Sequence, residues 1–126
     1  MFTNIENIKT RFDVMDITNI EAIIEQWLPA GENKLKSFTP QDVLEESGNA
    51  DRLELAESYC VFYFVLPVIA TQNGGMGIVK SVGFNDSKQS LLSDIDVRDR
   101  QLFYLSEARQ IVSALLETDG IRMYAI

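Results

Sequence analysis

The chain has 126 residues, and 46% of them are hydrophobic, a size and composition typical of one globular domain with a core of its own. Its 19 acidic and 11 basic residues give a net charge of −8, which argues against non-specific nucleic-acid binding by the surface as a whole. The chain has one cysteine and no histidine, which excludes an intrachain disulfide and removes the commonest general base and a favoured zinc ligand.

Residues 3–12 predict a short helix. Thr3 and Glu6 match a capping box, and Ile5, Ile8 and Phe12 fall on one face at helical spacing.

A second capping box, Thr18 with Glu21, precedes a longer helical pattern. Pro29 lies inside this pattern, where proline removes a backbone hydrogen bond. Because the apolar face stays in phase on both sides of Pro29, we expect a kinked but nearly continuous helix rather than two separate ones. Trp27 is interpreted as a core residue, with an interface role as the less favoured alternative. The apolar face consists of Ile20, Ile23, Ile24, Trp27, Leu28, Leu35 and Phe38.

Thr39 and Pro40 predict the start of a short helix that runs through Glu46 and buries Val43 and Leu44.

Residues 50–70 predict the central buried helix, capped by Asn49 or Asp51. In its first half we expect Glu54, Glu57 and Ser58 to point outward. Pro67 is expected to bend or shorten it. The run Val61–Ala70 is too short to span a bilayer, so we expect no membrane association. The predicted core contacts are Leu53, Leu55, Ala56, Tyr59, Cys60, Phe62, Tyr63 and Leu66.

Residues 72–77 predict a glycine-rich turn, and residues 78–84 alternate like a strand. A phosphate-binding loop is disfavoured, because a helix precedes these glycines and a strand follows them. The only nearby pairing candidate is the weak segment 89–92. An unpaired strand edge favours association, so we expect residues 78–84 to pair with another subunit.

The last helix is predicted at residues 97–118, with Asp94 or Asp96 as its cap and Asp119-Gly120 as its end. The tail after it is apolar and too short to fold alone, so we expect it to dock on a core or a neighbour. The predicted apolar stripe is Leu102, Leu105, Ile111, Val112, Leu115 and Leu116, with Phe103 and Ala108 beside it.

We expect no catalytic residues, no metal and no cofactor. Cys60 has no histidine to activate it and is interpreted as a core thiol. Asp86, Asp94, Asp96 and Asp99 lack the spacing of a calcium loop. The acidic pairs Glu45–Glu46 and Glu54/Glu57 are interpreted as solvated helix faces rather than acid–base pairs.

These patterns predict one domain over residues 1–126, with an N-terminal arm and short helix at 1–16 and a docking tail at 119–126. Its fold class is mainly α, a small bundle of three to five helices. A short β-strand or hairpin is expected between the last two long helices.

The order of these elements resembles the small head-to-tail connector, or adaptor, proteins of long-tailed bacteriophages and prophages. The resemblance lies in residues 20–28, 55–67, 74–84 and 103–116, and covers about residues 15–118. It implies a virion structural protein at the neck, made in the host bacterial cytoplasm. Such proteins form rings, commonly of twelve subunits, beneath the portal protein, and dock the next neck or tail component. They extend the channel through which DNA passes without sequence-specific binding.

Two sets of residues follow as expected contact sites. The subunit-interface set is Gly74, Gly75, Gly77, Ile78, Val79, Val82 and Phe84, and the docking-tail set is Arg122, Met123, Tyr124 and Ile126. Two alternatives remain: another phage neck or tail-completion protein, and a small cytosolic helical interaction module. An enzyme is the least favoured class, since no acid–base–nucleophile set is visible.

Overall fold

The computed structural model describes residues 1–72 and 94–124, with side chains placed for residues 1–71 and 96–116. These described residues form five α-helices and one 3₁₀ turn and contain no strand, which confirms the mainly α class. The predicted strand at 78–84 and its glycine turn lie outside the described residues. The elements are α1 (Ile5–Phe12), α2 (Ile20–Phe38), α3 (Gln41–Glu45), η1 (Ser47–Asn49), α4 (Ala50–Gln72) and α6 (Asp94–Tyr124).

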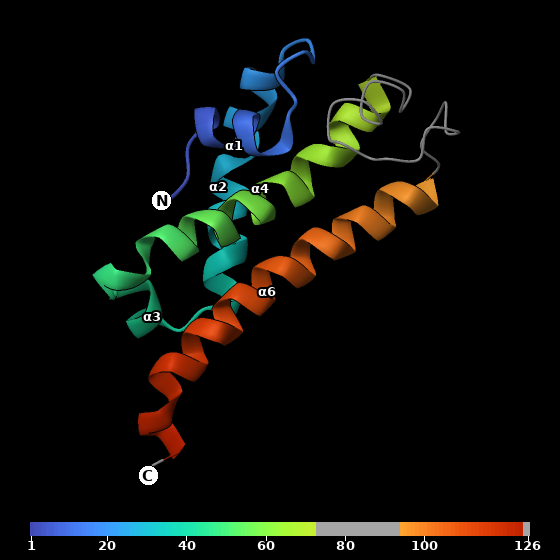
Figure 1. Cartoon of the computed structure of the whole chain (residues 1–126). Helices are drawn as coiled ribbons and strands as arrows, with labels where there is room; N and C mark the ends of the chain where they lie inside the picture. Colours follow the sequence, from blue (N-terminus) through green and yellow to red (C-terminus); the bar gives the residue numbers. More distant parts are fainter. Residues whose placement is uncertain (73–93, 125–126) are drawn as a thin grey trace.

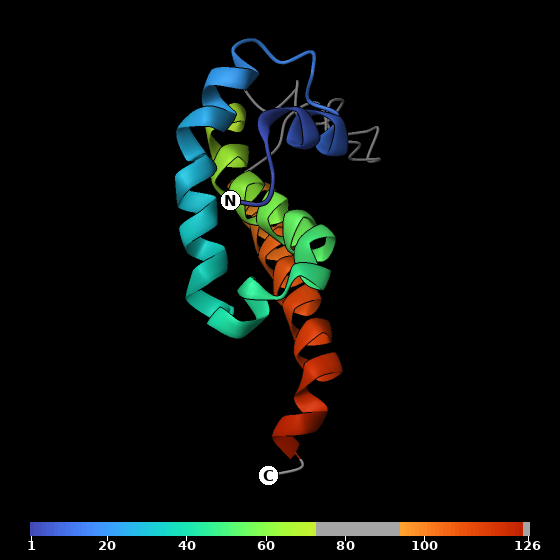
Figure 2. The same ribbon diagram turned by 90° about the vertical axis from the view of Figure 1, so that its left-hand side faces the viewer.

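Helix α4 lies between the other two long helices (Figure 1). It packs against α2 on one side, and α6 runs alongside it in the opposite direction. Helix α1 and the N-terminal arm lie over α4 and the start of α2 (Figure 2). In both views the last turns of α6 extend past the rest of the bundle.

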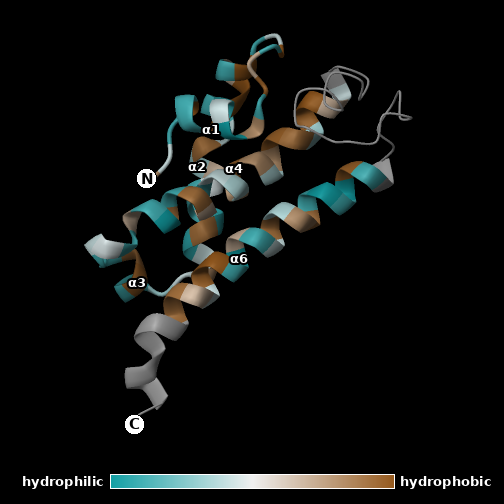
Figure 3. Cartoon of the chain, in the orientation of Figure 1, coloured by the Kyte–Doolittle hydropathy of each residue, from teal (hydrophilic) through white to brown (hydrophobic). Residues whose placement is uncertain are grey.

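The core is organised around α4, as predicted. Its second half is almost wholly hydrophobic (Figure 3), and Phe62, Val65 and Ile69 pack with α1, α2 and the first half of α6. Its first half contributes Leu53 and Cys60 to a second cluster with α2, α3 and the later turns of α6. By length and composition the stretch Ser47–Thr71 could cross a membrane, but 56% of its most apolar window is buried in this bundle. That burial is what a core helix requires.

Neither internal proline ends its helix. Helix α2 continues through Pro29, which confirms the expected continuity. Helix α4 continues through Pro67 to Gln72, so of the two effects predicted for Pro67, a bend or a shortening, the shortening does not occur. The carbonyl of Pro67 accepts a hydrogen bond from the Thr71 hydroxyl at 2.9 Å, within the following turn.

Helices α2 and α4 make their closest approach at Gly31. This glycine is buried against Val61, and a Cβ added to it would lie 2.3 Å from Val61 Cγ2 and 2.8 Å from Val61 Cα and N. Only a residue without a side chain allows the two backbones to pack at this distance.

The predicted helix caps are shifted by one residue. Asn4, not Thr3, caps α1, with its side chain accepting from the Asn7 amide at 2.8 Å. Asn19 precedes α2 in a left-handed conformation (φ 61°) and makes no side-chain cap bond. Thr39 belongs to the end of α2, where its hydroxyl donates to the Leu35 carbonyl at 2.6 Å, and α3 ends at Glu45 rather than Glu46. The sequence patterns therefore placed each of these caps one residue away from its position in the structure.

Helix α6 is longer than predicted, and its first half presents a different face to the core, whereas Val112 and Leu115 are buried as predicted. Its backbone stays helical through Gly120 to Tyr124, so the predicted stop at Asp119-Gly120 is wrong. The buried residues are Val97, Tyr104, Ala108, Val112 and Leu115, whereas Leu102 is 53% exposed. The ring of Tyr104 packs against Phe12 at 5.4 Å and Phe62 at 5.5 Å, which fixes this orientation.

Candidate functional site

The two predicted contact sets lie largely beyond the described side chains. The subunit-interface set, Gly74 to Phe84, falls wholly outside the described residues. In the docking-tail set, residues 122–124 are the last helical residues of α6 and Ile126 falls outside the described part. Residues 122–124 therefore extend a helix instead of forming the separate tail that was predicted.

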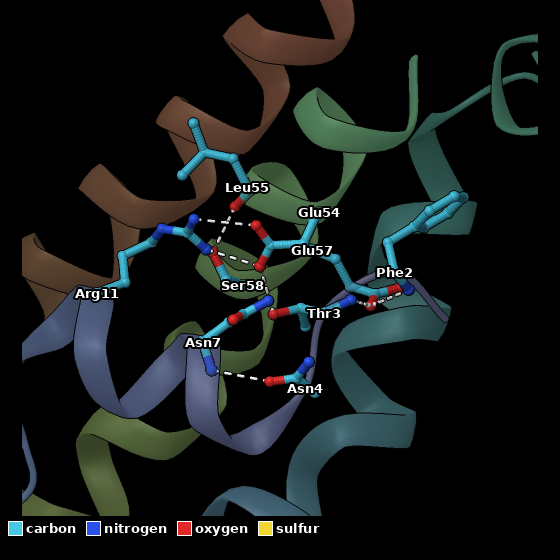
Figure 4. A network of polar contacts seen from close by, with 9 residues as sticks. All are labelled: Phe2, Thr3, Asn4, Asn7, Arg11, Glu54, Leu55, Glu57 and Ser58. Atoms are coloured by element: carbon cyan, nitrogen blue, oxygen red, sulfur yellow. Dashed lines mark hydrogen bonds and ion pairs between the residues drawn. The ribbon is translucent and has the colours of Figure 1, made fainter. Parts of the chain in front are cut away.

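Within the described residues, a buried carboxylate on α4 holds the N-terminal arm (Figure 4). Glu57 is 0% exposed, and its Oε1 accepts hydrogen bonds from the backbone amides of Phe2 at 2.7 Å and Thr3 at 2.8 Å. Its second oxygen, Oε2, is buried without a hydrogen-bond partner among the described atoms. The arm therefore depends on one side chain for its two innermost backbone donors.

One turn earlier, Glu54 joins the arm and α1 to the same helix. It accepts a bond from the Thr3 hydroxyl at 2.6 Å and a two-pronged bond from the Arg11 guanidinium at 2.7 and 2.9 Å. Arg11 also donates to the Ser58 hydroxyl at 3.1 Å. Paired donors of this kind fix the orientation of a guanidinium, so α1 is held in register on α4.

The two carboxylates have opposite pKa shifts. Burial raises the pKa of Glu57, against the lowering effect of the Thr3 and Phe2 amides. Partial burial also acts to raise the pKa of Glu54, but the bonds from Arg11 and Thr3 outweigh it and hold that pKa below the usual value. The ionised form is therefore disfavoured at Glu57 and favoured at Glu54.

The expectation that Glu54, Glu57 and Ser58 face solvent is wrong. Glu57 and Ser58 are both 0% exposed, covered by the arm and α1, and Glu54 is half-buried. Glu57 lies four residues after Leu53 and three before Cys60, so helical spacing alone places it on the buried stripe. The residue type suggested a surface position, and this spacing was the signal that could have corrected it.

The outer face of α6 exposes two large apolar side chains. Leu102 and Phe103 are 53% and 47% exposed. Beside them is a hollow of about 380 Å³ whose lining comes entirely from α6. The lining residues are Leu102, Leu105, Ser106, Arg109, Gln110 and Ser113.

Arg109 within this face is held in place by the α2 side of the bundle. Its guanidinium stacks over the Phe38 ring with 5.3 Å between the charged carbon and the ring centre. This cation–π contact holds the charged group beside the ring, and a guanidinium has several N–H donors with which it can bind an acid. The face is thus apolar near Leu102 and cationic about two turns later.

Two further residues have packing roles. Trp27 stacks on Phe64 with 5.6 Å between ring centres and is partly buried. Cys60 is fully buried, and burial raises the pKa of its thiol to about 12, which leaves almost no thiolate at neutral pH.

No three metal-binding side chains gather among the residues the structure describes. Protein-family models, curated proteins and solved structures were each compared with this chain, and none matches it. The functional conclusions below therefore depend on the sequence pattern and on the described geometry.

Proposed function

We propose that this chain is a non-enzymatic virion structural protein, a head–tail connector that assembles as a ring between the portal protein and the tail. The supporting observation is the arrangement of three long helices, α2, α4 and α6, with residues 73–93 joining the last two. This is the element order on which the resemblance to phage connector proteins depends. In that family the corresponding segment and the C-terminal region make contacts between subunits and with neighbouring proteins.

The projecting end of α6 agrees with a docking role. Its last turns extend past the bundle (Figures 1 and 2) and include residues 122–124, whose sequence is Arg-Met-Tyr. Helical residues that leave the domain have no core of their own to cover them, so a neighbouring protein is their natural partner. The neighbours in this proposal are the portal above and the next neck or tail component below.

The net charge of −8 agrees with a wall beside a DNA channel. A negative surface repels phosphates and lets DNA pass without adhering. In this proposal the chain binds DNA neither specifically nor tightly.

A small cytosolic helical interaction module is the second candidate. The exposed apolar pair Leu102 and Phe103 favours this candidate, because such a face fits any helical partner. A sheet-rich tail terminator is less favoured, since the described residues form only helices.

The test is native mass spectrometry of the purified chain, alone and mixed with a portal ring. The proposal predicts a complex in which multiple copies of the chain join one portal ring. A chain that ends at Asp119 should keep its fold, because Ala108 and Leu115 remain, and should lose binding to the downstream neck component. A stable monomer that does not bind the portal ring would overturn the proposal and would favour the helical interaction module.

A further inference from the structure

The hollow on the outer face of α6 has the residue spacing of a helix-binding surface. Its lining divides into two overlapping sets at positions i, i+3, i+4 and i+7: residues 102, 105, 106 and 109, and residues 106, 109, 110 and 113. Four residues at this spacing form the hole that receives one side chain of a facing helix. Two such holes in succession fit two side chains about one turn apart on another helix.

The two holes differ in chemistry. Leu102 and Leu105 make one side of the first hole apolar, and the small Ser106 and Arg109 bound its other side. The second hole is polar and is bounded by Arg109, Gln110 and Ser113. A matching helix must therefore present a large apolar side chain and, about one turn before or after it, an acid.

Helix α6 itself carries that pair. Leu102 and Phe103 are its exposed apolar side chains, and Asp99 lies exposed three residues before Leu102. In an antiparallel arrangement in which residue 102 faces residue 106 of the other copy, Leu102 meets the first hole and Phe103 lies beside it. The same register brings Asp99 to the second hole, beside Arg109.

We propose that the outer face of α6 binds a second copy of this chain as an antiparallel, two-fold helix pair. The charge complementarity of Asp99 with Arg109 occurs twice in this pair and selects the antiparallel direction over the parallel one. Arg109 is already held by its cation–π contact with Phe38, which reduces the ordering cost of the contact.

This contact is distinct from the ring proposed above. A two-fold contact is saturated by two chains, so it produces a dimer and cannot by itself close a larger ring. It requires neither the portal protein nor residues 78–84, and the two proposals can fail separately. A face of this length is small, so we expect a dimer that dissociates on dilution.

The first test is the mass of the full chain by sedimentation equilibrium over a concentration series. The wild-type mass should rise toward that of a dimer. Leu102→Ser should weaken dimerisation about tenfold to a hundredfold, the loss expected when a buried leucine is removed from an interface. Met15→Ser, at a residue that is 57% exposed and lies between α1 and α2, is the matched control and should change nothing.

The second test exchanges the charges. Asp99→Arg and Arg109→Glu should each weaken the dimer, and the double variant should restore it, because each acid–base pair is re-formed in reverse. Far-ultraviolet circular dichroism checks that each variant stays folded. Other occupants of the face do not predict recovery in the double variant.

The third test measures direction with a spin label on Ser113→Cys. In the antiparallel register the two labelled positions are separated by about 27 Å along the helix axis, whereas a parallel pair has no such offset. Cys60 is buried and its pKa is raised to about 12, so it should not take up the label. A monomer at every concentration, a dimer indifferent to Leu102→Ser and the charge reversals, or a short distance between labels would overturn the proposal.

Discussion

Replacement of Gly31 by alanine tests the packing of α2 on α4. The new Cβ would lie 2.8 Å from both the Cα and the N of Val61, and 2.3 Å from Val61 Cγ2. A rotamer change can relieve the contact with Cγ2 but not the two backbone contacts, so the helices must move apart. Such overpacking typically costs about 1–3 kcal/mol, and backbone contacts place this site at the upper end.

The higher helix propensity of alanine offsets part of that destabilisation. Alanine is favoured over glycine in a helix interior by about 1 kcal/mol. The balance predicts that Gly31→Ala lowers the free energy of unfolding by about 2 kcal/mol, measured by urea denaturation. Adding Val61→Ala should not restore stability, because the backbone contacts remain and the fully buried Val61 loses two methyl groups.

Gly48 provides the control. A Cβ there would meet only Glu46 Oε1, at 4.0 Å. Gly48→Ala should therefore change the free energy of unfolding by less than about 0.5 kcal/mol, as is usual for surface substitutions. If Gly31→Ala were as stable as the wild type, the close approach of α2 and α4 and the reasoning built on it would be refuted.

Further outcomes are expected at Glu57, Arg11 and Cys60. Glu57→Ala should destabilise the chain by about 1–3 kcal/mol, because it leaves the buried Thr3 amide without an acceptor, whereas Glu57→Gln keeps an acceptor for both amides. Burial raises the pKa of Glu57 in the folded state, so ionised Glu57 lowers the free energy of unfolding at neutral pH. The stability of Glu57→Gln relative to the wild type should therefore be greatest at neutral pH and should shrink as the pH falls through that raised pKa. Urea titrations at a series of pH values measure this difference. Arg11→Met should cost about 1 kcal/mol at low salt and less at high salt, because it removes the two-pronged bond to half-buried Glu54; a loss unaffected by salt would contradict this assignment. Cys60 should resist alkylation by iodoacetamide in the native chain and react once urea unfolds it, and rapid native labelling would contradict its burial.

The helical class and the central position of α4 could be predicted from the sequence because its second half is apolar on nearly every face. Leu53, Ala56 and Cys60 lie in the core as predicted. Helical spacing was sufficient for these three because they share one face of the amphipathic first half of α4.

The face of α6 could not be predicted in the same way. Its sequence carries two overlapping apolar stripes, one through Leu102 and Leu105 and one through Tyr104 and Ala108. The choice between them is made by the aromatic contacts of Tyr104 with Phe12 and Phe62, residues more than forty positions away. Local periodicity does not contain such tertiary contacts, so Leu102 was wrongly placed in the core and Tyr104 was left out of it, whereas Val112 and Leu115 are buried as predicted.

The buried position of Glu57 shows a similar limit. A carboxylate is disfavoured in a core unless it has partners, and its partners here are the backbone amides of Phe2 and Thr3. Backbone donors carry no sequence signal, so no pattern in the sequence marks them. Helical spacing puts Glu57 on the buried face, but its residue type led to the wrong prediction of a surface position.

Hydrogen exchange at residues 78–84, read by mass spectrometry, tests most directly whether this chain works as an assembly subunit. The dilute chain is compared with the chain mixed with a portal ring. The proposal predicts that these amides exchange rapidly in the dilute chain and become protected in the assembly, because their pairing partner is another subunit. Equal protection in both samples, with no complex formed, would show that this segment pairs within its own chain and would contradict the connector assignment.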